Sequence, residues 1–234
     1  MPDKSNHTDE FSKRAKSYTK HNIIQKKVAK HLISNISSKA KTILDLGAGS
    51  GAIYELIHGD IDKFVAVDLA SNLLKLHPKD KNVQIITANF DDKKLYESLE
   101  LFDLVVASSS LQWSDDLPNI LSQISKHTKE IAFAIFCDKT FKTIYNLTLL
   151  ESFLPSSQFA LKELEKLYEF KYEIKDYKLD FKDNISKFRY IKNSGVSGGK
   201  KQLSYKDTKK IIKDYPLDYL EFEVLFVWGK VKEG

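Results

Sequence analysis

Cysteine and long apolar runs are scarce in this chain of 234 residues, and each shortage excludes a class of protein. The single cysteine, Cys137, cannot form a disulfide within the chain, and it fits a reducing compartment. No stretch approaches the ~20 consecutive apolar residues that a membrane-spanning helix needs. The first residues are polar and contain no apolar core of a secretory signal. We therefore expect a cytoplasmic protein that does not associate with a membrane.

Motifs for metal binding and nucleophilic catalysis are also missing. The histidines show no spacing to one another, to Cys137 or to carboxylates that is typical of a metal site. No Ser-His-Asp arrangement or nucleophile elbow is present. We predict that the protein has no metal ion.

Arginine is nearly absent, because Arg14 and Arg189 are the only two in a chain of net charge +5. Lysines supply the remaining positive charge and are mixed with Glu and Asp, which favours a solvated surface over a basic face for an acidic partner. The densest lysine groups, at 200–201 and 206–213, lack the interleaved aromatic residues of a platform for single-stranded nucleic acid. We do not expect nucleic acid as a partner.

The chain does contain a regular alternation of short apolar runs and amphipathic segments. This alternation is typical of an α/β fold, in which helices cover both faces of a parallel sheet through right-handed crossovers. The expected strands are 42–46, 64–68, 83–87, 102–107 and 130–136, and the expected helices between them are 52–58, 70–76 and 117–127.

Further helices and strands are expected on either side of this core. Phe11, Tyr18, Gln25 and Leu32 recur every seven residues, which predicts a helix over about 11–34. The later elements are a helical stretch over 140–169 broken at Pro155, a strand at 172–181, helices at 184–192 and 205–214, and an apolar strand at 219–230.

The clearest motif is the loop after the first predicted strand, in which Asp45 precedes Gly47, Gly49 and Gly51. Its spacing is tighter than the G-x-G-x-x-G of a dinucleotide site. Asp45 would repel a pyrophosphate but suits a cationic amine. S-adenosylmethionine carries an ammonium group and a sulfonium but no phosphate, so it fits this loop. The alternative is a tight strand–helix turn without a ligand.

Polar residues also follow the other predicted strands. Asp68 lies where it can accept hydrogen bonds from two ribose hydroxyls. The alternative is that it caps the helix at 70–76, although Ser71 could serve there instead. Asn89 can pair with an adenine amino group and Phe90 can cover the ring, although both also fit a turn beside the core. We include Leu69 and Ser108, which follow or end predicted strands, among the expected cofactor contacts.

These motifs resemble those of known enzymes. The 45–51 loop together with Asp68 resembles the class I S-adenosylmethionine-dependent methyltransferase family. Segments along almost the whole chain resemble, more narrowly, the malonyl-acyl-carrier-protein O-methyltransferases of biotin synthesis. These segments are 11–18 with 25–29, 111–117, 191–195 and 215–219.

The resemblance implies methyl transfer from S-adenosylmethionine to the free carboxylate of a malonyl thioester on acyl-carrier protein. A carboxylate is already ionised at neutral pH, so the reaction needs no general base and depends on alignment and desolvation.

Under this interpretation Tyr18 orients the methyl group or the acceptor, and Gln25 secures the cofactor. Trp113 forms an apolar wall, although it also fits a core position. Arg14, Arg189 and Lys192 are the candidate anchors for the substrate carboxylate, because a cation must hold it; each also fits a plain surface charge.

Three other functions remain open from the sequence. The first is a methyltransferase for another small carboxylate, such as an aconitate-type acid, or for an amine. The second is a methyltransferase-fold binding module without turnover, and the third and least favoured is a nicotinamide oxidoreductase. The fold that we predict is a Rossmann-like, seven-stranded mixed sheet in one domain, 1–234, with the last strand antiparallel. The N-terminal helix and the insertion at about 140–169 form a helical lid, and we expect a monomer.

Overall fold

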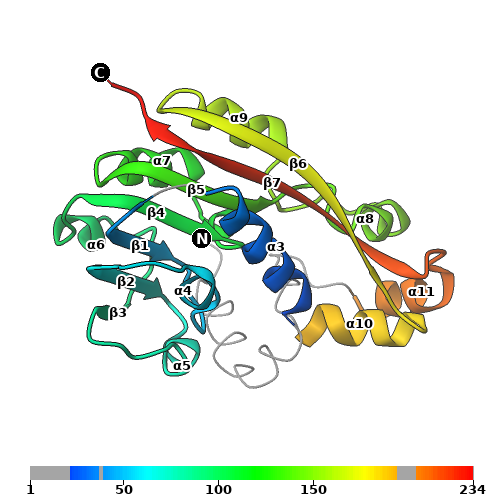
Figure 1. Cartoon of the computed structure of the whole chain (residues 1–234). Helices are drawn as coiled ribbons and strands as arrows, with labels where there is room; N and C mark the ends of the chain where they lie inside the picture. The colour runs from blue at the N-terminus through cyan, green and yellow to red at the C-terminus, as the bar shows by residue number, and fades with distance from the viewer. Residues whose placement is uncertain (1–21, 37–38, 194–203, 234) are drawn as a thin grey trace.

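The computed structural model describes residues 22–36, 39–193 and 204–233 (Figure 1). The helix expected over 11–34 is therefore seen only as α3 (Ile23–Ser34). Arg14 and Tyr18 lie outside the described residues.

The described residues form a sheet of seven strands in the order β3-β2-β1-β4-β5-β7-β6. The five strands expected from the first half of the chain are present and run parallel to one another. The later strand β7 inserts between β5 and β6 and runs antiparallel to both, so the predicted mixed sheet is confirmed. The strands are β1 (Thr42–Leu46), β2 (Lys63–Asp68), β3 (Val83–Thr87), β4 (Phe102–Ser108), β5 (Thr128–Phe136), β6 (Tyr168–Asp180) and β7 (Tyr219–Val231).

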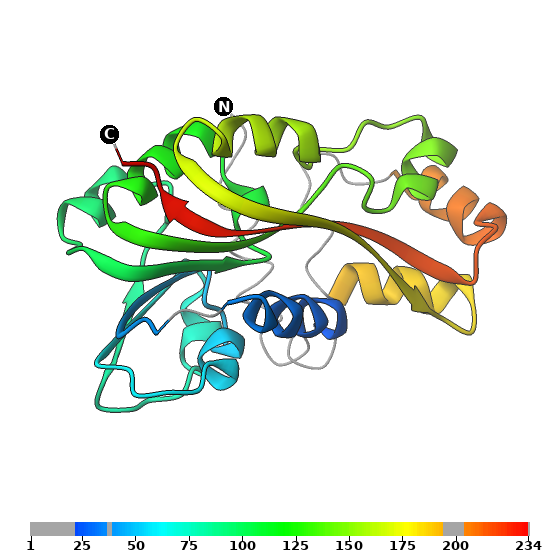
Figure 2. The same ribbon diagram turned by 45° about the horizontal axis from the view of Figure 1, so that its top comes forward.

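Helices cover both faces of the sheet (Figure 2). On one face lie α3, α4 (Ala52–Leu56) and α10 (Asn184–Asn193), and on the other lie α7 (Leu117–Ser125) and α9 (Ser157–Leu164). Each face has its own buried core. Ile24 and Val28 of α3 pack in the first core with alternate residues of the central strands. Leu121 of α7 and Leu164 of α9 pack in the second core with the strand residues whose side chains point to that face.

The remaining short elements join these layers. They are α5 (Ser71–Leu74), α6 (Lys93–Glu97), the 3₁₀ turn η1 (Leu111–Trp113), α8 (Lys142–Thr148) and α11 (Tyr205–Asp214). The sequence did not predict α6, a short helix that buries Leu95 and Tyr96 and whose first residues are capped by Asp92. The Asp92 carboxylate accepts a hydrogen bond from the Lys94 N–H at 3.0 Å.

The stretch expected to be helical over 140–169 differs from the prediction at its end. It contains α8 and α9, but β6 begins at Tyr168, four residues before the expected strand. Tyr168 is buried and its hydroxyl donates to the carbonyl of Leu121 on α7 at 2.7 Å, so packing against α7 extends the strand. α8 packs against α11 whereas α9 packs against α7. The lid over this stretch stays a prediction.

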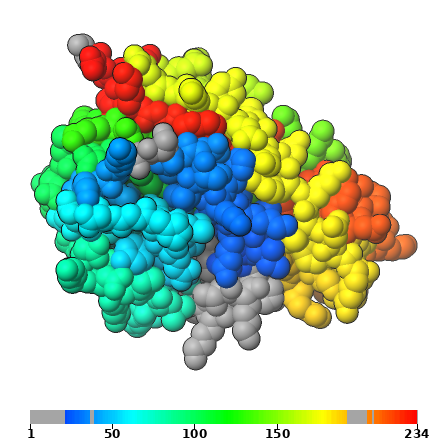
Figure 3. Space-filling model, viewed as in Figure 1, coloured from blue at the N-terminus to red at the C-terminus, as the bar shows by residue number. Residues whose placement is uncertain are grey.

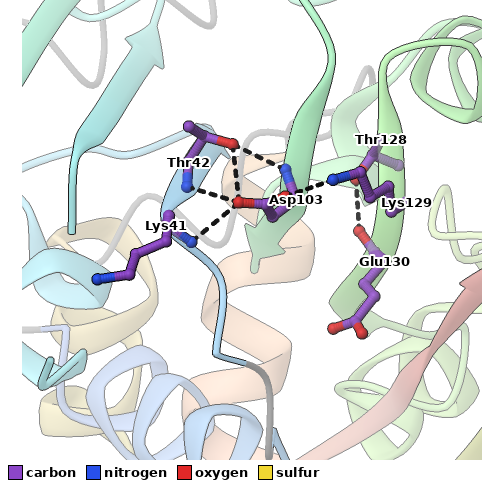
Figure 4. Close-up of polar contacts among 6 residues, drawn as sticks. All are labelled: Lys41, Thr42, Asp103, Thr128, Lys129 and Glu130. Atoms are coloured by element: carbon purple, nitrogen blue, oxygen red, sulfur yellow. Dashed lines mark hydrogen bonds and ion pairs between the residues drawn. The ribbon is translucent and has the colours of Figure 1, made fainter. Parts of the chain in front are cut away.

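A polar cluster ties the amino ends of β1, β4 and β5 together (Figure 4). The Asp103 carboxylate accepts hydrogen bonds from the Lys41 and Thr42 N–H groups, both at 3.0 Å, and from the Thr42 hydroxyl at 3.1 Å. Lys129 donates to its other oxygen at 2.8 Å. These bonds, led by the Lys129 ammonium, hold the pKa of Asp103 well below its usual range.

In the part of the chain that the structure describes, no helix is long and apolar enough to cross a membrane. The same residues contain no group of three or more His, Cys, Asp or Glu side chains that is able to hold a metal ion.

Candidate active site

The glycine loop after β1 has positive φ angles and, at Gly47, a close approach to a neighbouring segment, and both favour glycine. The Gly47 N–H donates to the Val67 carbonyl at 2.8 Å, which fixes the loop to the end of β2. Gly47 has a φ of 80°, and a Cβ placed there would lie 2.3 Å from the Cβ of Ser110. Gly49 has a φ of 54° and open space around its missing Cβ. The loop is therefore pressed against the segment after β4 at Gly47 and open at Gly49.

Asp45 lies under this loop, on β1, and is 1% exposed. Both of its carboxylate oxygens are buried and have no hydrogen-bond partner. Burial, and secondarily the charge of Asp68, raises the pKa of Asp45 to about 8. A buried carboxylate without partners is unfavourable, and a cation with several N–H donors would relieve that cost. The site is thus suited to an ammonium group.

Asp68 ends β2 beside the loop. One carboxylate oxygen accepts from the Gly49 N–H at 2.8 Å, and the other accepts from the Ala70 N–H at 2.7 Å. Burial raises its pKa, while these backbone N–H groups oppose the rise. Each oxygen keeps a second lone pair, so Asp68 retains the capacity to accept bonds from ribose hydroxyls. The α5 helix that follows is not capped by this side chain, because its N-cap is Ala70.

Two polar residues after β4 were missed by the sequence reasoning. Ser109 has a φ of 62°, a strained conformation for serine, and its buried hydroxyl has no partner. Gln112 is buried, and its amide nitrogen donates to the Ser109 carbonyl at 2.8 Å. The amide oxygen of Gln112 is buried without a partner. The apolar neighbours Leu111 and Trp113 make burial of Gln112 foreseeable, but the missing partner is visible only in the structure.

The other expected cofactor residues lie along the same edge. Asn89 follows β3 and its side-chain oxygen accepts from the Asp91 N–H at 3.0 Å, which is the turn that we weighed as its alternative role. Phe90 packs against the core on the α7 face. Leu69 is 42% exposed beside Asp68, and Ser108 ends β4. Their contacts with a cofactor stay predictions.

Trp113, which we expected to form an apolar wall, contacts Phe153. Their rings are stacked with centroids 5.7 Å apart and an angle of 24° between planes. Phe153 lies between α8 and α9 and is 38% exposed. This stack brings part of the expected lid stretch next to η1.

Gln25, Arg189 and Lys192 belong to α3 and α10, which cover the face of the sheet opposite α7 and α9. Gln25 on α3 has a buried side-chain oxygen without a partner. Arg189 lies on α10 and is exposed. Tyr190, the next residue, is buried in the same core as Ile24 of α3, so α10 and α3 pack together. Lys192 belongs to α10, but its side chain is outside what the structure describes.

The arrangement as a whole defines a class of protein. A glycine loop with a buried acid follows β1, a second acid ends β2, and unpaired oxygens of Ser109 and Gln112 follow β4. In an open α/β sheet, ligands bind at this carboxyl edge, where the strand order reverses between β1 and β4. The sheet order and the glycine loop together are those of a Rossmann-like methyltransferase.

A family model described as a methyltransferase domain matches residues 19–164, and the chain belongs to that family. The predicted family is therefore confirmed.

Curated relatives include enzymes named malonyl-[acyl-carrier protein] O-methyltransferase. That of Anoxybacillus flavithermus is 29% identical over 153 residues, which cover 62% of this chain and 58% of the relative. That of Prosthecochloris aestuarii is 26% identical over 210 residues, which cover 80% and 76%. The match spans only 51–58% of the length of the first such relatives. A shorter match, 39% identical over 82 residues, covers 35% of this chain and 24% of the human protein named arginine-hydroxylase NDUFAF5, mitochondrial.

Solved structures share the fold. The YcgJ protein of Bacillus subtilis has a TM-score of 0.64 at 11% identity, covering 88% of this chain and 98% of that one. The N-methyltransferase NodS of Bradyrhizobium japonicum has a TM-score of 0.52 at 10% identity, covering 90% and 86%, and its structure is a complex with S-adenosylhomocysteine. The cofactor predicted from the sequence, S-adenosylmethionine, is consistent with this fold.

Proposed function

We propose that the protein transfers a methyl group from S-adenosylmethionine to the free carboxylate of a malonyl thioester on acyl-carrier protein. The observation that supports the donor is Asp45, whose two buried oxygens lack partners that an ammonium group would supply. The acceptor is supported by the names of the curated relatives and by the segment around Leu111–Trp113. This reaction would be an early step of pimeloyl and biotin synthesis. It replaces the negative charge of the malonyl carboxylate with a neutral methyl ester.

The residues that would hold the cofactor follow from their chemistry. Asp45 pairs with the ammonium group, and Asp68 accepts from the ribose hydroxyls. Gly49 leaves space for close approach. We place Gln25 and the Gln112 oxygen among the acceptors around the cation, because each is buried and lacks a partner. Bound S-adenosylmethionine supplies the electrophilic methyl group.

The protein's own contribution to the reaction is alignment and exclusion of water. The acceptor carboxylate is ionised at neutral pH, so no side chain has to remove a proton. The stacked rings of Trp113 and Phe153 form an apolar wall that removes water from the reacting groups. A cation has to hold the acceptor carboxylate in line with the methyl group, because a desolvated carboxylate without a partner is unfavourable. We assign that role to Arg189, with Arg14 and Lys192 as further candidates and Tyr18 orienting the reacting groups.

The decisive experiment follows transfer of labelled methyl groups from S-adenosylmethionine to three acceptors. Malonyl-acyl-carrier protein should be methylated fastest, free malonyl-coenzyme A more slowly, and aconitate not at all. Transfer to aconitate alone would replace the substrate and keep the enzyme class. Failure to bind S-adenosylhomocysteine would instead favour a binding module without turnover.

Arg189→Ala tests the carboxylate anchor. We expect KM for malonyl-acyl-carrier protein to rise about tenfold or more, because a charge-assisted bond to the substrate is lost. The affinity for S-adenosylhomocysteine should not change. Lys182→Ala, also at an exposed position and with the same change of charge, is the matched control. Unchanged kinetics in Arg189→Ala would remove this residue as the anchor.

A further inference from the structure

Strand β6 forms the outer edge of the sheet, at the opposite end from β3. It crosses the middle of the view in Figure 2, between α9 and α3, and reaches the surface beside α3 in Figure 3. Tyr172 and Ile174 on this strand are 55% and 41% exposed. A long edge strand with exposed apolar side chains is a template for pairing with another strand.

The hydrogen bonds at both ends of the β6–β7 ladder show which backbone groups of β6 point outward. The Leu167 carbonyl accepts from the Lys232 N–H at 3.0 Å, and the Phe181 N–H donates to the Asp218 carbonyl at 2.8 Å. The register between these ends is unbroken. Residues in antiparallel strands alternate between bonding one neighbour and facing the other side. Odd-numbered residues of β6 therefore bond β7, and the N–H and C=O groups of even-numbered residues face the edge, where no other strand of the described residues pairs with them.

We propose that two copies of this chain form a dimer by antiparallel pairing of their β6 strands, with the two-fold axis at Tyr172. In this register the even-numbered residues, whose backbone groups face outward, bond one another across the axis. The side chains are complementary as well. Across the interface the pairs are Glu169 with Lys175, Phe170 with Ile174, and Lys171 with Glu173. The two glutamates also have ion pairs within their own chain, Glu169 with Lys230 at 3.4 Å and Glu173 with His31 at 2.7 Å, so the pairs across the axis would add to these.

The order of charges selects this register over its neighbours. An axis at Lys171 would place that lysine against its own copy and Glu169 against Glu173. An axis at Glu173 would likewise oppose like charges. Like charges directly opposite each other destabilise a strand pair, and opposite charges stabilise it. Charged residues usually protect an edge strand from pairing, but here their order disfavours the neighbouring registers and favours pairing at Tyr172.

A surface cavity beside the axis offers space for the partner. It has a volume of about 480 Å³ and is lined by Glu165, Tyr168, Phe170, Tyr172 and Lys232. Phe170 lies opposite Ile174 of the other copy, so that isoleucine is placed to fill the cavity. The proposal departs from the monomer that we expected from the sequence, and it does not depend on the proposed reaction.

Charge reversal tests the register in the full chain by sedimentation velocity over a range of concentrations. Glu169→Lys puts two lysines opposite each other at two symmetric positions, and dimerisation should weaken about tenfold. Adding Lys175→Glu restores the pairs and should restore the dimer. Lys81→Glu, exposed beyond the opposite edge of the sheet, should leave the dimer unchanged. A monomer at all concentrations, or no recovery in the double variant, would overturn the proposal.

A cross-link tests the axis directly. In a hydrogen-bonded antiparallel pair the two Cα atoms lie about 5.5 Å apart, within the range of a disulfide. Tyr172→Cys should therefore give a covalent dimer under mild oxidation. The two copies of position 178 would lie roughly 40 Å apart, so Lys178→Cys should not. The native Cys137 is buried and should not contribute. Equal cross-linking at both positions would contradict the proposed axis.

Discussion

Two aspartates lie at opposite ends of neighbouring strands, and their surroundings are opposite too. Asp103, at the amino end of β4, accepts bonds from two backbone N–H groups, a hydroxyl and a lysine (Figure 4). Asp45, near the carboxyl end of β1, has no partner for either oxygen. The pKa of Asp103 is lowered and that of Asp45 is raised to about 8. Asp103 at the amino edge is satisfied within the protein, whereas Asp45 at the carboxyl edge has two buried oxygens without a partner.

The largest expected effect is that of Asp45→Asn on the cofactor site. Binding of S-adenosylhomocysteine should weaken about a thousandfold, roughly 4 kcal/mol, because a buried charge pair loses one partner. Calorimetry measures this change. The ligand-free variant should be at least as stable as the parent at pH 8, because it no longer buries an ionisable group. A variant that binds normally would show that Asp45 is not the ammonium partner.

Gly47→Ala should break the packing of the loop. We expect a loss of roughly 3 kcal/mol in the free energy of unfolding, because the new Cβ meets Ser110 at 2.3 Å and φ is positive. Gly49→Ala, with a positive φ but open space, should lose only about 1 kcal/mol. Urea unfolding compares the two, and equal losses would contradict the contact with Ser110.

Asp103→Asn tests whether the amino edge of the sheet serves stability and not cofactor binding. The free energy of unfolding should fall by about 1–2 kcal/mol at pH 7, and cofactor affinity should stay the same. The native pKa is below the unfolded value, so this stability is present above about pH 4 and lost as the pH falls further. Chemical unfolding of both proteins at pH 7 and pH 3 should show the difference shrink, because the unfolded carboxylate takes up its proton before the folded one does. A loss of cofactor affinity would contradict the separation of the two edges.

The smallest expected effect is the release of a proton when the cofactor binds. At pH 6.5 ligand-free Asp45 is protonated, because its pKa is about 8, while an α-amino group is charged. Binding of the cation should therefore release about one proton. Calorimetry in buffers of different ionisation enthalpy counts it. Asp45→Asn should release none, and the same count in both proteins would exclude Asp45 as the source.

Linkage also predicts the pH dependence of the protein without ligand. The unfolded chain releases the Asp45 proton near pH 4, and the folded protein keeps it to about pH 8. The contribution of Asp45 to stability therefore falls as the pH rises between these values.

The sequence predicted the central strands well because buried parallel strands are short, continuous apolar runs. It predicted β1 at its observed bounds, and also β3, although β3 is a partly exposed edge strand. It missed α6, which has few apolar residues and depends on a cap. It also placed the start of β6 late, because the Tyr168 contact with α7 is a tertiary effect that no local pattern encodes.

The site was predictable where backbone geometry demands a residue type and less so elsewhere. Gly47 and Asp68 are set by the loop itself, so their types and spacing are visible in the sequence. The strain at Ser109 and the unpaired oxygen of Gln112 arise from packing between elements far apart in the chain. Only the three-dimensional structure shows that a buried polar atom lacks a partner, and Ser109 and Gln112 were found in that way.

The position of β7 has a consequence for biosynthesis. This strand follows β6 in the chain, yet it lies between β5 and β6 in the sheet. While the ribosome is still translating, β6 has emerged but has no strand to join, and β5 keeps an open edge. Because this pairing closes only when residues 219–231 emerge, a nascent chain stalled before them should stay sensitive to proteases over both strands.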